Sequence, residues 1–178
     1  MPRISVPPEQ DPLAYLWGQL APDLTSAAAQ MSDAIYHRSR LPLREFEAAR
    51  VRIAHINDCN VCRRFRTARD MPGRPEAPDA VPEDLYEHVL DPSWDGYTAR
   101  ERLAIEFAER FALDHVAMDD EFWARLHAHF TDDELVDLAI CVGWLIASGR
   151  VQRVFEVDNA CQVPLSDLHA SVAAAQRA

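Results

Sequence analysis

The spacing of the apolar residues constrains the fold more than any other feature of this chain. They recur every three or four positions in several segments, and no segment of useful length alternates apolar and polar residues. The first spacing places apolar side chains on one face of a helix, whereas alternation indicates a strand. Phe46, Ala49 and Ile53 share one helical face in this way. Glycine occurs only five times, while Ala, Leu, Glu and Arg are abundant, which also favours helix. The sequence therefore predicts an all-α fold.

Prolines and capping residues indicate where the expected helices begin. Pro22 suits the first position of a helix, where its missing N–H removes no helical hydrogen bond. Thr131 and Glu134 have the spacing of a capping box, in which each side chain pairs with a backbone N–H of the first turn. The expected helices cover residues 12–20, 22–37, 43–56, 59–70, 98–113, 118–130, 131–157 and 165–175, with a short element at 83–90.

The rest of the chain is expected to be irregular. Residues 1–10 are rich in proline and read as an extended N-terminal segment, and four prolines within residues 71–84 indicate a long loop. A chain of 178 residues is long enough for one domain with a substantial core and short for two. We therefore expect residues 1–178 to form a single helical domain.

The charge of the chain restricts its partners. The formal net charge is −11, and binding to nucleic acids or anionic membranes requires clustered cationic groups, so we predict neither partner. The N-terminal residues lack the apolar segment of a secretory signal. The longest apolar stretch, residues 138–147, is about half the length needed to span a bilayer. We expect a cytoplasmic protein, in which thiols are kept reduced.

Cys59 and Cys62 form a C-x-x-C motif, the sharpest chemical feature of the sequence. Asp58 can cap a helix that begins at Cys59, where the helix dipole and free N–H groups favour a thiolate. Cysteines three positions apart share a helix face, so their sulfurs can approach bonding distance. One thiolate can then attack a peroxide or disulfide while the second resolves the product. A pair of buried structural cysteines is the alternative interpretation.

A zinc site is a further interpretation of the motif. Structural zinc sites require four ligands, usually from two closely spaced pairs. Cys141 and Cys161 stand alone in the sequence, and His127 and His129 are two positions apart, which places them on different faces of a helix. We therefore expect no metal and no other cofactor.

Residues 47–66 resemble the signature of the alkylhydroperoxidase D/carboxymuconolactone decarboxylase family. Glu47 stands twelve residues before Cys59, as the glutamate does in that family, and Asn57-Asp58 matches the break before the cysteines. The segments 98–113 and 131–157 also resemble the C-terminal half of the family. The likeness covers most of the chain, but its specific motif is confined to about twenty residues.

The resemblance implies a fold and a set of roles. It implies an all-α, alkylhydroperoxidase D-like helical bundle that associates into trimers or larger rings. In the cysteine-bearing branch it implies reduction of hydroperoxides, supported by an external thiol reductant. Cys62 matches the cysteine that is oxidised to a sulfenic acid, and Cys59 matches the partner that donates a proton and closes the disulfide. Glu47 matches the carboxylate of the proton relay, although it can equally serve as an ion-pair partner.

The chain departs from the family at the relay histidine, whose place is taken by Arg66. An arginine cannot accept a proton at neutral pH, so the relay cannot operate here as it does in the family. If the helix continues, Arg66 lies one turn beyond Cys62 and Arg63 one turn beyond Cys59, where their charges can lower a thiol pKa. Alternatively, both arginines belong to a solvated face and pair with carboxylates. His55, one turn before Cys59, is a further candidate to replace the histidine.

The leading functional interpretation is a thiol-dependent peroxidase or disulfide reductase that acts on hydroperoxides. One alternative is a carboxymuconolactone decarboxylase-like enzyme, with Arg66 or Arg63 holding the carboxylate of a small substrate. The other is a degenerate, non-enzymatic family member that has lost the relay histidine and whose helices serve to form a homo-oligomer or to bind other proteins.

Overall fold

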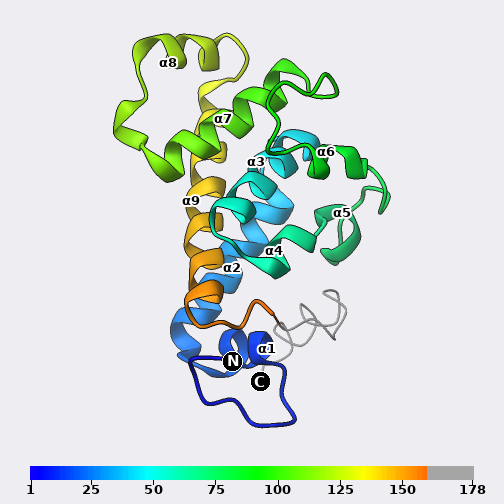
Figure 1. The fold of residues 1–178 in the computed structure, drawn as a ribbon, viewed down its shortest axis with the longest axis vertical. Helices are drawn as coiled ribbons and strands as arrows, with labels where there is room; N and C mark the ends of the chain where they lie inside the picture. Colours follow the sequence, from blue (N-terminus) through cyan, green and yellow to red (C-terminus); the bar gives the residue numbers. More distant parts are fainter. Residues whose placement is uncertain (160–178) are drawn as a thin grey trace.

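The computed structural model describes residues 1–159, and the helix expected at residues 165–175 lies outside this range. All regular structure in the described part of the chain is helical, which confirms the all-α prediction (Figure 1). The elements are α1 (Pro12–Gln19), α2 (Pro22–Arg38), α3 (Leu43–Ile56), α4 (Asn60–Arg64), α5 (Thr67–Asp70), α6 (Glu83–Glu87), α7 (Ala99–Leu113), the 3₁₀ turn η1 (His115–Ala117), α8 (Asp120–His127) and α9 (Asp132–Val154).

The main hydrophobic core lies between α3, α7 and α9, with α2 packed against α9 (Figure 1). Phe107 and Leu138 are fully buried in it, and Ile53 supplies the apolar face predicted for α3. A smaller cluster, which includes Val51 and Leu85, lies beneath the segment around α6. None of the helices among residues 1–159 combines the length and apolarity that crossing a membrane requires.

The C-terminal end of α3 is fixed against α9 at Gly149. A Cβ atom at this position would lie 2.5 Å from the side-chain nitrogen of Asn57, so a larger residue would displace the Asn57 amide from its place. The Asn57 amide donates to the carbonyl oxygen of Leu145 at 3.0 Å and accepts from Arg150 at 3.2 Å. This buried contact holds the residues just before the C-x-x-C motif in a defined position.

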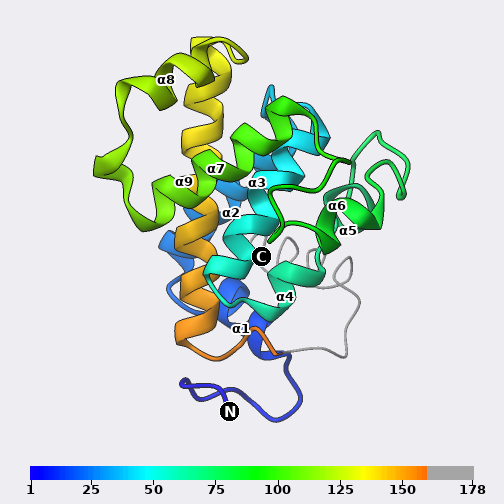
Figure 2. The same cartoon turned by 45° about the horizontal axis from the view of Figure 1, so that its top comes forward.

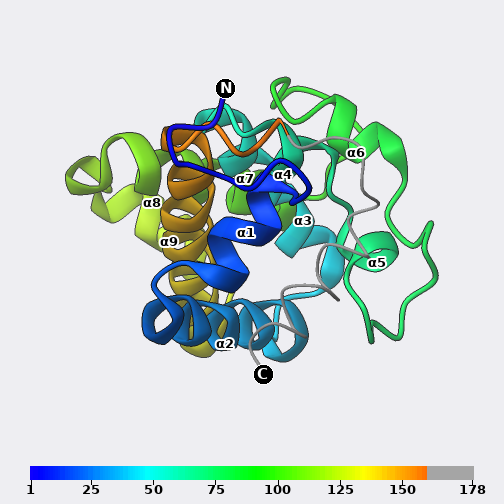
Figure 3. The same cartoon turned by 90° about the horizontal axis from the view of Figure 1, so that it is seen from below.

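The motif lies at one end of the molecule, where α1, α4 and the end of α9 meet; α8 lies at the opposite end (Figure 2). Leu13 and Leu16 of α1 pack with Cys59, Val61 and Val157 in a third apolar cluster. The N-terminal segment runs beside the end of α9, to which it is joined by a backbone hydrogen bond from Arg3 to Phe155 (Figure 3).

The predicted helix over residues 59–70 is wrong at its start. Asp58 does not cap it; Asp58 adopts a left-handed conformation, with φ of 52°, and closes the end of α3. The N–H of Asp58 bonds to the carbonyl of His55, and the N–H of Cys59 bonds to that of Ala54, as in the Schellman motif. Cys59 itself is the N-cap of the next helix, α4. The helical register of His55 therefore does not continue to the cysteines.

The same prediction also fails at Phe65, where the backbone is extended and α4 has ended at Arg64. In a continuous helix, the carbonyls of Cys62 and Phe65 would accept from N–H groups one turn later. Here both carbonyls accept hydrogen bonds from Arg50, at 2.7 and 2.6 Å. The N–H of Arg66 donates to the Asp70 carboxylate instead. Tertiary side-chain contacts thus replace the helical bonds and divide the segment into α4 and α5.

Candidate redox site

Cys59 and Cys62 are joined by a disulfide, with their Cα atoms 5.3 Å apart. Cys59 is fully buried, whereas Cys62 is partly exposed. The N–H of Cys62 donates to the sulfur of Cys59 at 3.3 Å, so the Cys59 sulfur occupies the position of an N-capping side chain. An N–H directed at a sulfur in this way stabilises a thiolate when the pair is reduced.

The segment that follows α9 holds the cysteine turn from outside. Asp158 is fully buried, and its carboxylate accepts from the N–H of Asn60 at 3.0 Å. The side chain of Asn60 in turn donates to Asn159. Arg153 binds the carboxylate of Asp58 at 3.0 Å. These contacts attach the first turn of α4 to a part of the chain nearly a hundred residues away.

Gln152, near the end of α9, contacts both sulfurs. Its side-chain oxygen lies 3.5 Å from the sulfur of Cys59 and 3.5 Å from that of Cys62. Sequence reasoning missed this residue, because it lies 90 positions after Cys62 and no local motif surrounds it.

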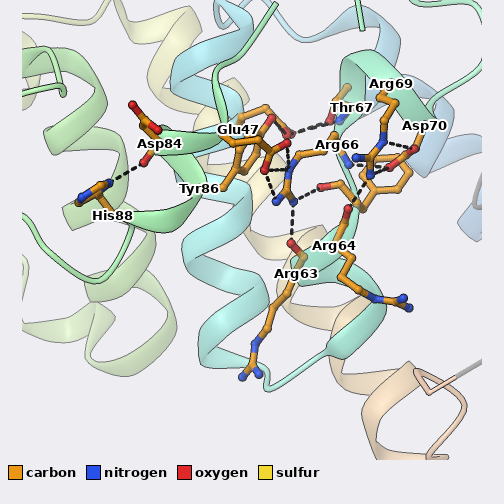
Figure 4. A network of polar contacts seen from close by, with 12 residues as sticks. Glu47, Arg63, Arg64, Arg66, Thr67, Arg69, Asp70, Asp84, Tyr86 and His88 are labelled. Atoms are coloured by element: carbon orange, nitrogen blue, oxygen red, sulfur yellow. Dashed lines mark hydrogen bonds and ion pairs between the residues drawn. The ribbon is translucent and has the colours of Figure 1, made fainter. Parts of the chain in front are cut away.

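Glu47 is completely buried in α3 and is paired with Arg50 on the same helix. Its carboxylate also accepts hydrogen bonds from the hydroxyl groups of Thr67 and Tyr86, both at 2.6 Å, and from the N–H of Thr67 at 3.4 Å. Figure 4 shows these side chains converging from α3, α5 and α6. Every side of the carboxylate is therefore engaged within the protein.

The pKa values in this network follow from its charges. Burial alone would favour the neutral acid of Glu47, but the charge of Arg50 and the surrounding hydrogen bonds outweigh it and lower the pKa of Glu47. The pKa of Tyr86 is raised, by burial and by the neighbouring carboxylate. Although burial opposes its charge, Arg50 has a raised pKa because of Glu47. Glu47 is thus held ionised, and its connection to Cys62 runs through the Arg50 guanidinium and the Cys62 carbonyl.

Arg66 and Arg63 are both paired with carboxylates. Arg66 binds Glu83 with its Nε and one terminal nitrogen, at 3.1 and 2.8 Å, and its guanidinium lies 3.8 Å from the ring centre of Tyr86. Arg63 pairs with Asp58, and its side chain extends away from Glu47 (Figure 4). Pairing with carboxylates is part of the solvated-face interpretation, but the Arg66 side chain is only 15% exposed and also donates to the carbonyls of Arg63 and Phe65. An effect of either charge on a thiol stays a prediction.

His55 lies in the last turn of α3 and is partly buried. Burial, together with the charges of Arg63 and Arg52, lowers the pKa of its imidazole. The ring is therefore neutral at pH 7 and can accept a proton. The reversal of the chain at Asp58 separates it from the helix that bears the cysteines.

A pocket of about 770 Å³ opens beside Cys62. It is lined by Gln152, by apolar groups that include Trp17, Val61 and Trp144, and by polar side chains of α2 such as Asp33 and His37. Cys62 lines this pocket and Cys59 does not. A molecule that enters the pocket therefore meets the Cys62 sulfur first.

A third cysteine, Cys141, lies in the main core and is not bonded to another cysteine. Its side chain is 4% exposed, and burial raises the pKa of the thiol to about 11. Among residues 1–159, no three His, Cys, Asp or Glu side chains form a cluster suited to a metal ion.

A scan against protein-family models gives no match, and a search of curated proteins finds no similar sequence.

Proposed function

We propose that this protein is a thiol-dependent peroxidase, in which Cys59 and Cys62 reduce an organic hydroperoxide. The observation that carries the proposal is the unequal environment of two bonded cysteines. Cys62 lines a large pocket, whereas Cys59 is buried behind it and already linked to it by a disulfide. A substrate-facing cysteine with a protected partner is the arrangement that a two-cysteine reduction needs. The resemblance of residues 47–66 to the alkylhydroperoxidase D-like family supports the same assignment.

The first step takes place at Cys62. Its thiolate attacks the terminal oxygen of the hydroperoxide, the O–O bond breaks, and Cys62 becomes a sulfenic acid. The departing alkoxide takes the proton of the Cys59 thiol and leaves as an alcohol. Cys59 is then a thiolate, which the N–H of Cys62 stabilises at the N-cap of α4.

The second step forms the disulfide. The Cys59 thiolate attacks the sulfur of the sulfenic acid, the S–S bond forms, and hydroxide leaves and is protonated to water. Two equivalents of an external thiol then reduce the disulfide and become a disulfide themselves. The overall reaction consumes one hydroperoxide and two thiols.

Within this proposal, Glu47 and Arg50 act by holding the cysteine turn. A relay carboxylate has to accept a proton during the reaction. Arg50, Thr67 and Tyr86 stabilise the anion of Glu47 and lower its pKa, so Glu47 is a weak proton acceptor. Arg50 binds the carbonyls of Cys62 and Phe65, and so fixes the backbone next to the reactive sulfur. The role that the resemblance gives to Glu47 is in this way replaced by a structural one.

The decarboxylase-like alternative has less geometric support. It requires a free guanidinium to hold a substrate carboxylate, and Arg66 and Arg63 already bind Glu83 and Asp58. Neither arginine lines the pocket beside Cys62. The non-enzymatic alternative predicts that a disulfide forms without any effect of peroxide, which the experiment below tests.

A cytoplasmic location and a homo-oligomer, a trimer or a multiple of one, are also part of the proposal. The apolar residues Val136 and Ile140 of α9 are 58% and 49% exposed, and covering them is a reason for chains to associate. Light scattering at micromolar concentration tests this, and a monomer would contradict it.

Counting thiols before and after one equivalent of cumene hydroperoxide tests the enzymatic proposal. In the fully reduced protein, we expect peroxide to remove both the Cys59 and the Cys62 thiols. Cys59→Ser should stop at a sulfenic acid on Cys62, which dimedone traps, and Cys62→Ser should not react. Cys141→Ser is the control and should behave as the wild type. Full retention of both thiols in the presence of peroxide would exclude a peroxidase.

A further inference from the structure

The carboxamide of Gln152 lies against the two atoms that change oxidation state. Its oxygen is equidistant, at 3.5 Å, from the sulfurs of Cys59 and Cys62, and a hydrogen bond that involves sulfur is normally longer than one between nitrogen and oxygen. The same side chain lines the pocket beside Cys62. Gln152 is therefore in direct contact with the reacting atoms.

The contact of Gln152 with the sulfurs can be a hydrogen bond in only one of the two redox states. In the dithiol, each sulfur carries a proton that can be donated to an amide oxygen. In the disulfide, neither sulfur carries a proton, so the oxygen has only a van der Waals contact with them. A hydrogen bond available in one state alone shifts the equilibrium toward that state. The acceptor therefore favours the reduced pair.

The position of Gln152 does not depend on the disulfide. The residue belongs to α9, which closes with the N–H of Val157 bonded to the Gln152 carbonyl. The next residue, Arg153, is bound to Asp58 just before Cys59, and Asp158 is bound to the N–H of Asn60. These contacts hold the end of α9 against the cysteine turn whether or not the sulfurs are bonded to each other.

We propose that Gln152 is a third catalytic residue of the redox site, and that its side-chain oxygen sets the thiol–disulfide equilibrium by accepting a hydrogen bond from the thiol of Cys59 or Cys62. Because the oxygen is equally far from both sulfurs, it can accept a hydrogen bond from either thiol of the reduced pair. The inference rests on the proposed redox function of the pair. It adds the residue that makes the disulfide easier for an external thiol to reduce.

Two substitutions of Gln152 should shift the thiol–disulfide equilibrium in opposite directions. Gln152→Leu removes the acceptor and keeps most of the volume, so the equilibrium should move toward the disulfide, by about fivefold. Since tenfold corresponds to about 30 mV for a two-electron couple, this shift is about 20 mV. Gln152→Glu supplies a charged and stronger acceptor, so the equilibrium should move toward the dithiol. A purely structural role would not reverse sign between the two variants.

The equilibrium is measured in buffers of reduced and oxidised glutathione at pH 7, with the reduced fraction determined by alkylation and mass spectrometry of the peptide that contains Cys59 and Cys62. Gln19→Leu, at an exposed position in α1, is the matched control and should leave the equilibrium unchanged. Circular dichroism confirms that each variant is folded before it is measured. Shifts in the same direction for Gln152→Leu and Gln152→Glu, or no shift in either, would overturn the inference.

The failure of this inference is distinguishable from the failure of the proposed function. The glutathione equilibrium requires no peroxide, so opposite shifts without peroxide turnover would support Gln152 and exclude the peroxidase. Peroxide turnover with unchanged glutathione equilibria would support the peroxidase and exclude the role of Gln152.

Discussion

Two ion pairs meet at Tyr86, one at its hydroxyl group and one over the face of its ring, and their carboxylates differ in access to water. Glu47 and Arg50 are buried on the side of the hydroxyl group, which donates to the Glu47 carboxylate. Arg66 lies over the face of the ring and binds Glu83, whose side chain is 58% exposed. Glu47 matches the relay carboxylate of the family that the sequence resembles, and Arg66 stands where that family has its relay histidine. The carboxylate is completely buried in the first pair and largely exposed in the second.

The difference shows that burial, more than the presence of an ion pair, decides what the pair does. In water, attraction between two charges is weakened by the solvent and by salt, so a surface pair contributes little. In the interior, a charge that loses its partner remains desolvated and unpaired. The buried pair therefore fixes the turn that bears Cys62. The pair of Arg66 and Glu83 is expected to contribute less to the stability of the fold.

The largest effect is expected on breaking the buried pair. Arg50→Met keeps an unbranched apolar side chain but leaves Glu47 uncompensated, which typically costs about 3–5 kcal/mol. The two carbonyls of the cysteine turn also lose their donor. Urea denaturation of the wild type and the variant gives the change in the free energy of unfolding. Arg66→Met is the matched control, and equal losses in the two variants would contradict the comparison.

The pH dependence of stability should also separate the pairs. Because the pKa of Glu47 is lowered in the folded protein, its ionised form stabilises the fold above the ordinary value of about 4.5, and this contribution is lost as the pH falls through the lowered pKa. Glu47→Gln should therefore lose most stability at neutral pH, with a gap to the wild type that narrows below pH 4.5. Glu83 also has a lowered pKa, through Arg66, but is largely exposed, so Glu83→Gln should show a small gap throughout. Thermal unfolding from pH 3 to pH 7 measures both.

Tyr86→Phe should affect the buried pair alone, because it removes the hydroxyl group and keeps the ring beneath Arg66. Losing a hydrogen bond to a charged acceptor costs about 1.5–3 kcal/mol. The double variant with Glu47→Gln completes a mutant cycle, from which the coupling between Tyr86 and Glu47 is obtained. A coupling near zero would mean that the hydroxyl group contributes nothing to the buried pair.

The smallest effect is expected at Arg66. Arg66→Ala removes the ion pair with Glu83, the contact with the ring of Tyr86 and the hydrogen bonds to the carbonyls of Arg63 and Phe65. Together these are worth about 1–2 kcal/mol. With the guanidinium bound to Glu83, we also expect the pH dependence of iodoacetamide alkylation of the reduced cysteines to stay near that of the wild type. A clear rise of the thiol pKa in Arg66→Ala, reversed in Arg66→His, would instead assign Arg66 the electrostatic role.

The long helices were predictable because local signals and tertiary packing agree in them. The periodicity that includes Phe46 and Ile53 gave α3, and the capping box at Thr131 is formed as expected. The prediction failed between residues 58 and 70, where tertiary contacts override local propensity. Nothing in the local sequence indicates that Arg50 takes the carbonyls of Cys62 and Phe65 and thereby ends the helix.

The candidate site was predictable only in part, for a related reason. The spacing of Cys59 and Cys62 identified the bonded pair, and the resemblance drew attention to Glu47. The contact with Gln152 depends on how α9 packs against the cysteine turn, and a single sequence carries no local signal for such a packing. Asp58 was misread because aspartate is common at helix N-caps, although it also tolerates the left-handed conformation that it adopts here.

Because Cys141 is buried, its rate of chemical modification reports how often the core opens. A thiol with a pKa of about 11 that is only 4% exposed reacts slowly with alkylating reagents while the helices stay packed. Its rate of modification at neutral pH therefore follows the opening of α9 from α2 and α3. Since Arg50→Met weakens the attachment of the cysteine turn to α3, labelling at Cys141 distinguishes a loosening confined to the turn from one that reaches the core.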